Sequence, residues 1–480
     1  MVTTLNKADL DLCYMSATDV LAKFRARSLS PVEYLDNLIA RTEEVEPRIN
    51  AFTATHFDKA MVQAKSAEAR YAKGTGDLRP LEGLPVAIKD EVDLTGEIVT
   101  QGSLYYKDEV ATETHFAAQR LFDAGAFYHA QTTTPEFCCA GVTDSRIHGT
   151  TRTPWGLDYT CGGSSGGSGA SLAAGSTPLA TGSDIGGSIR IPAACCGVVG
   201  YKPPYGRNPD NTAFAYDMYA VVGPMGRTVE DVALMQNIMC GPHPLDNASI
   251  RPKYELPLTH KGLKGLKIAW SMDLNFFEID DHVRTNTLRT LDILKDLGAE
   301  LVEVDLSWTA RAERAVEVYL DHLFGGYMAS VVETDPSLAS PWAAYCVKAN
   351  QNTSSTEFYD AYEAQMEMGR AFGIVLEDCY AFICPTLGHH EIPADQNPAD
   401  RLAINGKAVN PMYGWTLCHP FNMLGRCPVL SVPSGIGGNG LPTSVQIVAR
   451  HLDDARVFRV GQALQQANPL LTTINNRPKL

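Results

Sequence analysis

The sequence predicts an α/β protein: one large domain with a twisted, mixed β-sheet covered by helices on both faces. Two observations predict this fold class. Short apolar runs alternate with longer segments of helical periodicity through most of the chain, as expected for a sheet covered by helices. No polar linker and no internal repeat divides the 480 residues, so a single domain over residues 1–480 is favoured over two.

The N-terminal part, about residues 1–75, is predicted to be helical. Ser30 can cap a helix whose first residue is Pro31, and Glu33 lies at the third helical position, where an acid completes a capping box. Apolar side chains then recur at helical spacing, at Leu35, Leu38 and Ile39.

The remaining elements follow in alternation. Apolar runs bounded by turn residues predict strands at 84–88, 126–130, 178–181, 267–270, 301–304, 380–384, 429–432 and 444–448. Helical periodicity predicts helices at 116–124, 170–174, 228–239, 283–297 and 453–466. The stretches 205–220 and 385–412 are long and rich in Pro, Gly and Asn, so we expect them to be functional loops around a substrate.

Two loops rich in glycine and serine, residues 161–169 and 181–190, are the most informative part of the chain. An apolar, helix-like stretch and a strand-like run lie between them, so neither loop is a linker. Glycines let the backbone turn sharply and approach a ligand, and consecutive N–H groups in such turns can converge on one oxygen. We therefore expect rigid loops at a sheet edge that hold serines in place.

Lys89 and Ser188 are candidates for chemistry, each with a plainer alternative. Lys89 ends an apolar strand; it is either a surface lysine or a buried one whose pKa is lowered by burial, so that it can act as a base. Ser188 follows two glycines and is either a turn serine or part of an oxyanion-binding loop. The sequence gives no support for the nucleophile elbow of the usual Ser-His-Asp hydrolases, and the P-loop pattern is absent.

Composition argues against several function classes. The formal net charge of −15 disfavours a nucleic-acid partner, because phosphate binding needs a basic surface. No segment resembles a secretory leader or a membrane span, so we expect a cytoplasmic protein. The 12 cysteines show no C-x-x-C spacing and are predicted to be buried thiols. His389, His390 and Glu391 lack the spacing of a helical zinc motif, so no metal site is predicted.

The chain resembles the amidase signature family. The motifs that carry the resemblance are 162–167, 181–192 and 196–203, with the lysine-bearing strand 83–90 before them. The likeness extends over about residues 20–465, with a signature core at about 80–205. It implies the amidase signature fold and no metal or organic cofactor.

The resemblance also implies roles for individual residues. Ser188 would be the nucleophile, and Ser164, after a cis peptide from Gly163, would bridge Ser188 to a neutral Lys89 that acts as base. The oxyanion hole would consist of N–H groups of Ile185, Gly186, Gly187 and Ser188. The residues that hold the loops would be Ser165, Asp184 and Arg190. We expect substrate contacts from Thr134, Phe137, Gly163, Tyr205 and Arg207.

These roles predict a hydrolase of aryl and acyl amides, with esters and carbamates (urethanes) as further substrates. Its partner would be a small molecule; a homodimer is left open. The alternative is the glutaminase subunit of a tRNA-dependent amidotransferase, which would need a charged clamp for glutamine; Arg207 and Arg426 are candidates for half of that clamp. A third alternative is a non-catalytic binding protein on the same fold.

Overall fold

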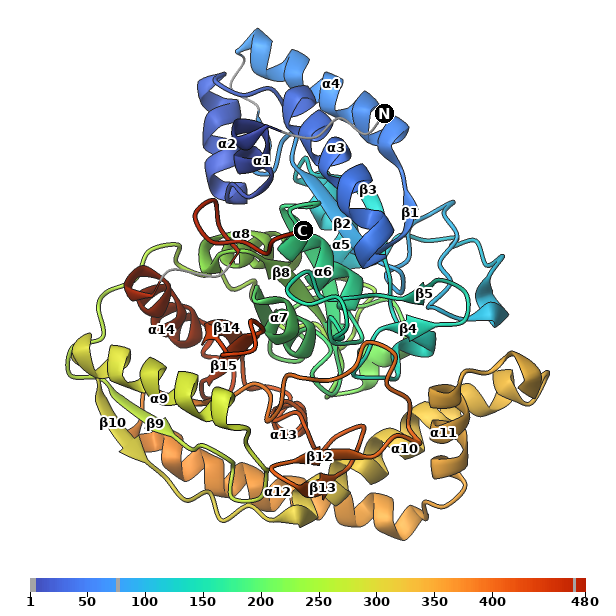
Figure 1. The fold of residues 1–480 in the computed structure, drawn as a ribbon, viewed down its shortest axis with the longest axis vertical. Helices are drawn as coiled ribbons and strands as arrows, with labels where there is room; N and C mark the ends of the chain where they lie inside the picture. The colour runs from blue at the N-terminus through green and yellow to red at the C-terminus, as the bar shows by residue number, and fades with distance from the viewer. Residues whose placement is uncertain (1–5, 75–77, 469–471) are drawn as a thin grey trace.

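A large mixed β-sheet runs through the molecule, with helices against it (Figure 1). The computed structural model describes residues 6–74, 78–468 and 472–480. Within these residues the main sheet has 11 strands. In spatial order they are β1 (Phe52–Thr55), β3 (Phe127–Thr132), β2 (Pro85–Lys89), β6 (Leu179–Asp184), β8 (Val221–Gly226), β7 (Val199–Lys202), β14 (Val429–Ile436), β15 (Pro442–Val448), β11 (Ala381–Pro385), β9 (Lys267–Trp270) and β10 (Glu300–Glu303).

Both parallel and antiparallel pairs occur in this sheet. Strand β2 runs parallel to β3 and β6, and β9 runs parallel to β10 and β11. The central strands β6, β8, β7, β14 and β15 pair antiparallel. The prediction of a single α/β domain with a mixed sheet between helices is therefore confirmed.

The helices fall into groups along the chain. The N-terminal group is α1 (Lys7–Cys13), α2 (Ala17–Ala26), α3 (Pro31–Ile49) and α4 (Phe57–Lys73). The helices of the middle and the C-terminal end are α5 (Phe116–Asp123), α6 (Gly166–Ala174), α7 (Arg190–Cys196), α8 (Val229–Met239), α9 (Asp281–Asp296), α13 (Pro420–Met423) and α14 (Asp454–Ala467). The third group, α10 (Ala310–Val332), α11 (Pro341–Asn350) and α12 (Ser355–Asp378), packs together at the end of the molecule opposite α1–α4 (Figure 1).

Short elements complete the fold. Single 3₁₀ turns lie at η1 (Leu104–Tyr106), η2 (Glu136–Cys138), η3 (Ala213–Tyr216) and η4 (Pro336–Leu338). Two small hairpin sheets consist of β4 (Asp144–Ser145) with β5 (Gly149–Thr150), and β12 (Leu402–Ile404) with β13 (Lys407–Val409).

The first turn of α3 shows why the sequence folds as it does locally. The Ser30 side chain accepts a hydrogen bond from the Val32 amide, and the Glu33 carboxylate accepts one from the Ser30 amide, which completes a capping box. Buried side chains, Leu35 and Leu38 among them, follow at helical spacing along one face. The helix predicted after Ser30 is thus present.

Several elements were not predicted. Strand β1 lies inside the N-terminal part that was expected to be helical, at one edge of the sheet. Strand β8 contains Gly223, Pro224 and Gly226, which are poor strand formers, yet it lies between β6 and β7 and is buried throughout. Helices α10–α12 were also missed, and they supply much of the largest hydrophobic core.

All 12 cysteines are free and buried in the structure. No helix among the described residues is long and apolar enough to cross a membrane. The same residues contain no group of three or more His, Cys, Asp or Glu side chains arranged to hold a metal ion, and His390 instead lies 2.8 Å from the Asn439 amide.

Candidate active site

The site lies where strands β2 and β6 end. The two strands run parallel, so the residues that follow Lys89 and Ser183 meet at one edge of the sheet. The first glycine–serine loop precedes α6 and carries Ser164. The second loop joins β6 to α7 and carries Ser188. The structure therefore brings both loops and the lysine strand together.

Lys89 is fully buried and binds three side chains. Its Nζ donates to Ser164 Oγ at 2.7 Å and to Ser183 Oγ at 2.6 Å, and it lies 2.8 Å from Glu91 Oε2. The peptide between Gly163 and Ser164 is cis. Gly163 is required there, because a Cβ would lie 2.6 Å from the carbonyl oxygen of Ala140.

Glu91 changes the electrostatics that the sequence suggested for Lys89. Burial alone would lower the pKa of Lys89, but Cys138 and the Glu91 carboxylate together favour the ammonium and raise that pKa overall. The pKa of Glu91, which burial would raise, is held below its usual value by Lys89 and by hydrogen bonds. The expectation of a lowered lysine pKa was therefore wrong, because it took no account of a carboxylate two residues away.

Ser188 lies in a tight loop and is 8% exposed. Its carbonyl accepts a hydrogen bond of 3.1 Å from the Ser165 amide, which ties the two glycine–serine loops together. Its Oγ has no hydrogen-bond partner among the described residues. Nor have the amides of Ile185, Gly186 and Ser188, whereas the Gly187 amide donates to Asp184 Oδ1 at 2.9 Å. Three of the four amides assigned to an oxyanion hole are thus without an internal acceptor in the described structure.

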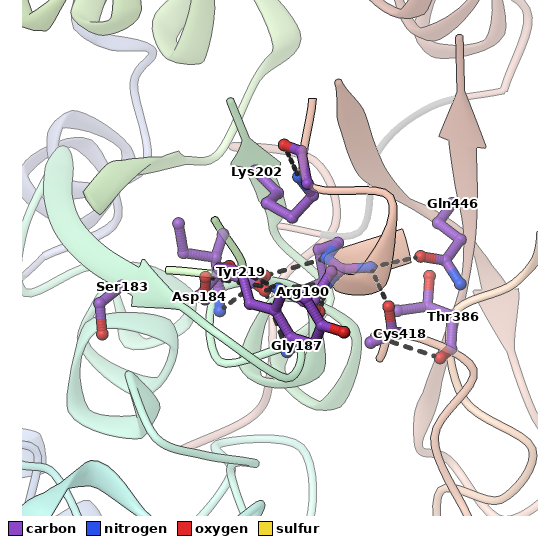
Figure 2. A network of polar contacts seen from close by, with 12 residues as sticks. Ser183, Asp184, Gly187, Arg190, Lys202, Tyr219, Thr386, Cys418 and Gln446 are labelled. Atoms are coloured by element: carbon purple, nitrogen blue, oxygen red, sulfur yellow. Dashed lines mark hydrogen bonds and ion pairs between the residues drawn. The ribbon is translucent and has the colours of Figure 1, made fainter. Parts of the chain in front are cut away.

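Asp184 and Arg190 anchor the second loop (Figure 2). Arg190 is fully buried, and its guanidinium donates to both oxygens of Asp184 at 2.9 Å. Burial would raise the pKa of Asp184, but Arg190 outweighs it and holds that pKa below its usual value. The guanidinium also donates to Gln446 of β15 at 2.8 Å and to Asn422 of α13 at 2.6 Å. The loop that bears Ser188 is therefore fixed to the C-terminal part of the sheet.

A cavity of about 600 Å³ opens beside this site. Ser164, Ser183, Asp184 and Ile185 contribute to its lining. Aromatic side chains supply much of the remainder: Phe137, Phe214, Tyr216, Tyr319, Phe324, Tyr327, Phe358 and Tyr362. A second cavity, of about 40 Å³, is lined by Ser188 and Gly186 and shares Ile185 with the first.

The residues predicted to contact substrate are found in different places. Phe137 lines the large cavity. Thr134 Oγ1 lies 3.0 Å from Cys138 Sγ, and Thr134 is not among the lining residues. The Tyr205 hydroxyl donates to the carbonyl of Ala215 at 2.8 Å. Arg207 pairs with Asp454 at 2.7 Å and does not line the cavity, so the geometry gives its predicted substrate contact no support.

The two loops expected around the substrate differ in how much each contributes to the lining of the cavities. Residues 205–220 supply lining residues from Asp210 to Ala220. From residues 385–412, only Met412 reaches either cavity, and it lines the smaller one.

Sequence reasoning missed part of the site. Glu91 lies two residues beyond Lys89, in the turn that follows β2, and a carboxylate so close to the lysine in the sequence could have been noticed. Tyr319, Phe324 and Tyr327 come from α10, which has no motif. No local signal could have placed them near Ser188, because more than a hundred residues separate the two segments.

The fold and the site define an α/β enzyme with serine-bearing loops at the edge of a mixed sheet, and comparison with known proteins identifies its family. The amidase family model matches residues 33–458, so the chain belongs to the amidase signature family, hydrolases that act on amides. It is 33% identical to an acylamidase of Rhodococcus erythropolis over 96% of both chains. It is 32% identical to one subunit of the glutamyl-tRNA(Gln) amidotransferase of Carboxydothermus hydrogenoformans, covering 95% of this chain and 98% of the relative. The solved structure of a bacterial aryl acylamidase matches with a TM-score of 0.89 at 25% identity, over 96% of this chain and 98% of the other.

Proposed function

We propose that this protein is a serine hydrolase that cleaves aryl and acyl amides through Ser188, Ser164 and Lys89. The observation that carries the proposal is the 2.7 Å hydrogen bond from the buried Lys89 Nζ to Ser164 Oγ, on the loop tied to Ser188. A lysine held against a serine can relay a proton to and from a nucleophile.

The chemistry would proceed in two halves. Neutral Lys89 takes the proton of Ser164 while Ser164 takes that of Ser188, whose Oγ attacks the carbonyl carbon. The amides of Ile185, Gly186 and Ser188 stabilise the oxyanion, and the Gly187 amide joins them if it releases Asp184. The proton returns to the leaving amine, and an acyl-enzyme remains. Water then attacks the acyl group by the same relay, which frees the acid.

The residues around the relay would act through position. Ser165 holds the two loops together through its amide, and Asp184 and Arg190 fix the second loop to the sheet. A carbamate or an ester presents the same carbonyl to Ser188, so we include urethanes and esters among the proposed substrates. No step in this scheme calls for a metal or an organic cofactor.

The large cavity favours this function over the glutaminase alternative. Free glutamine carries an α-carboxylate that needs a cationic clamp, since a buried charge without a partner costs several kcal/mol. Among the residues that the structure describes, no Lys or Arg lines the cavity. Of the two arginines considered for a clamp, Arg207 is paired with Asp454, and Arg426 lines a different groove.

The experiment is a comparison of kcat/KM for p-nitroanilides, p-nitrophenyl esters and aryl carbamates with that for glutamine, on the purified chain and on its Ser188→Ala variant. We expect anilide cleavage that disappears in the variant. A preference for glutamine, above all one that depends on a second protein, would favour the amidotransferase instead.

A further inference from the structure

Asp217 is a buried carboxylate in the wall of the large cavity, with one oxygen unused. It is 6% exposed and lines the cavity that also contains Ser164 and Ser183. Both of its hydrogen bonds are accepted by Oδ1, at 2.6 Å from the Tyr319 hydroxyl and at 2.9 Å from the Tyr219 amide. Its Oδ2 is buried and has no hydrogen-bond partner within the described structure.

The other carboxylates of this cavity have cationic or titratable partners. Glu91 pairs with Lys89 at 2.8 Å, and Asp184 pairs with Arg190 at 2.9 Å. Asp210 lies 3.6 Å from His115.

Asp217 alone has no such partner within 4.0 Å in the described part of the chain. Burial accordingly raises its pKa, against the two hydrogen bonds that lower it. A buried carboxylate oxygen that accepts no hydrogen bond carries a free-energy cost. A ligand that donates a hydrogen bond to Oδ2 would remove this cost and bind more tightly for that reason.

The neighbouring side chains fit a positively charged donor. The Tyr319 ring stacks on Tyr219, with centroids 3.9 Å apart, and on Phe358 at 5.4 Å. Phe358 in turn meets Tyr362 edge-on at 5.5 Å. Tyr319, Phe358 and Tyr362 line the cavity together with Asp217. Aromatic rings attract ammonium groups, and because Tyr319 is already stacked on Tyr219 and Phe358, the rings left to meet one are those of Phe358 and Tyr362. No lysine or arginine of the described residues lines the cavity to oppose an ammonium.

We propose that Asp217, oriented by the Tyr319 hydroxyl, forms with the rings of Phe358 and Tyr362 a subsite for an amino group, so that preferred substrates carry a basic amine in addition to the bond that is cleaved. The inference rests on the proposed function, because the amine would be recognised while the scissile carbonyl lies at Ser188. The subsite would therefore select a substrate by its amino group, which takes no part in the cleavage of the amide bond.

The test compares pairs of p-nitroanilides that differ in a single group. Each pair has an ω-amino acyl chain and its isostere in which a methyl group replaces the ammonium, for example 4-aminobutyryl and pentanoyl. The acyl chain is varied in length over a short series, so that in one pair the amine can reach Asp217 while the scissile carbonyl lies at Ser188. We expect the wild type to favour the amine of the best pair in kcat/KM by about 10- to 100-fold, the range of a hydrogen bond between charged groups.

Two variants separate the subsite from the rest of the cavity. Asp217→Asn should bring the ratio for that pair close to one and leave hydrolysis of the methyl isostere nearly unchanged, which also shows that the variant is folded. The matched control is Asp210→Asn, which removes a cavity carboxylate that already lies beside His115. It should keep a ratio near that of the wild type.

Inhibition gives a second measurement that does not depend on turnover of the amine substrate. Butylammonium should inhibit hydrolysis of the methyl isostere more strongly than butanol does, and Asp217→Asn should abolish the difference. Equal ratios for every pair in wild type and variant would overturn the subsite and leave the hydrolase intact. Failure to cleave any anilide would instead count against the proposed function.

Discussion

At the scale of single residues, the most consequential contact is that between Lys89 and Glu91. A lysine that serves as a base must be neutral, yet the carboxylate 2.8 Å away favours its charged form. Neutral Lys89 is therefore the minor species at neutral pH, and activity should rise as the pH becomes alkaline. Glu91 holds the Lys89 amine close to Ser164, but it also lowers the fraction of Lys89 that is neutral and able to act as a base.

Glu91→Gln should shift the pH profile. The variant keeps a hydrogen-bonding group beside Nζ but loses the charge, so the pKa of Lys89 falls and the neutral form is present at lower pH. We expect the rising limb of kcat/KM to move down by about one to three pH units, the usual effect of one close charge.

The measurement is the pH dependence of anilide hydrolysis from pH 6 to 11, with exposed Glu109→Gln as the control variant. A limb that stays in place would mean that Lys89 does not titrate in the rate-limiting step.

Ser188→Ala and Lys89→Ala should both impair hydrolysis without unfolding the protein. The first removes the proposed nucleophile, and no activity above background is expected. The second removes the proton relay, and loss of such a group costs about 10²- to 10⁴-fold in rate. Initial rates and circular dichroism measure the two effects separately.

Ser171→Ala is the matched control, since it removes another buried serine hydroxyl, from α6, that binds only a backbone carbonyl. Wild-type turnover by Ser188→Ala would refute the assignment of the nucleophile.

At the scale of elements, the loop at 205–220 is held at its base by an ion pair with a distant helix. The guanidinium of Arg207 donates through Nε to both carboxylate oxygens of Asp454, at the start of α14, and through Nη2 to one of them. Its Nη2 also donates to the carbonyl of Leu452 at 2.8 Å. Both charged side chains are buried. The loop that lines the cavity is therefore attached to the far end of the sequence.

Arg207→Ala should act on stability first. It leaves the Asp454 carboxylate buried with no cationic partner at this contact, and breaking a buried pair costs about 3–5 kcal/mol. We expect a clear loss in the free energy of unfolding, measured by chemical denaturation, and unchanged ratios among anilide, ester and carbamate rates.

Exposed Arg284→Ala serves as the control. Altered substrate ratios at unchanged stability would restore the sequence-based expectation that Arg207 contacts the substrate.

Local patterns explain which elements the sequence could predict. Strand β9 was predicted at its observed bounds, because a short apolar run is bounded there by turns. The glycine–serine loops were recognised because clustered glycines mark places where the backbone turns sharply or approaches another group closely. Helices α10–α12 and strand β8 could not be placed, since their stability comes from packing across the molecule. The aromatic wall of the cavity depends on those helices and was missed with them.

At the scale of the whole molecule, the C-terminal strands lie inside the sheet. Strands β14 and β15 separate β7 from β11, so they join the signature core to the part built by residues 267–385. Strand β15 also contributes Gln446 to the Arg190 network (Figure 2). Neither half of the sheet is complete without residues that come last in the chain.

This topology predicts a single unfolding transition. Circular dichroism and tryptophan fluorescence should change together during denaturation, since loss of β14 and β15 exposes both halves of the sheet. A variant that ends at residue 425, and so lacks β14, β15 and α14, should fail to give soluble protein. Two resolved transitions, or a folded truncated variant, would contradict this view of the sheet.

The burial of every cysteine has a practical consequence for attaching this protein to surfaces and dyes. Because all 12 thiols lie inside, the native surface offers maleimide reagents almost nothing to react with. A single cysteine introduced at Val62, which is 65% exposed on α4, would be the preferred attachment point without removal of any natural thiol. The chain could then be immobilised in one orientation, with the helices around its cavity facing the liquid.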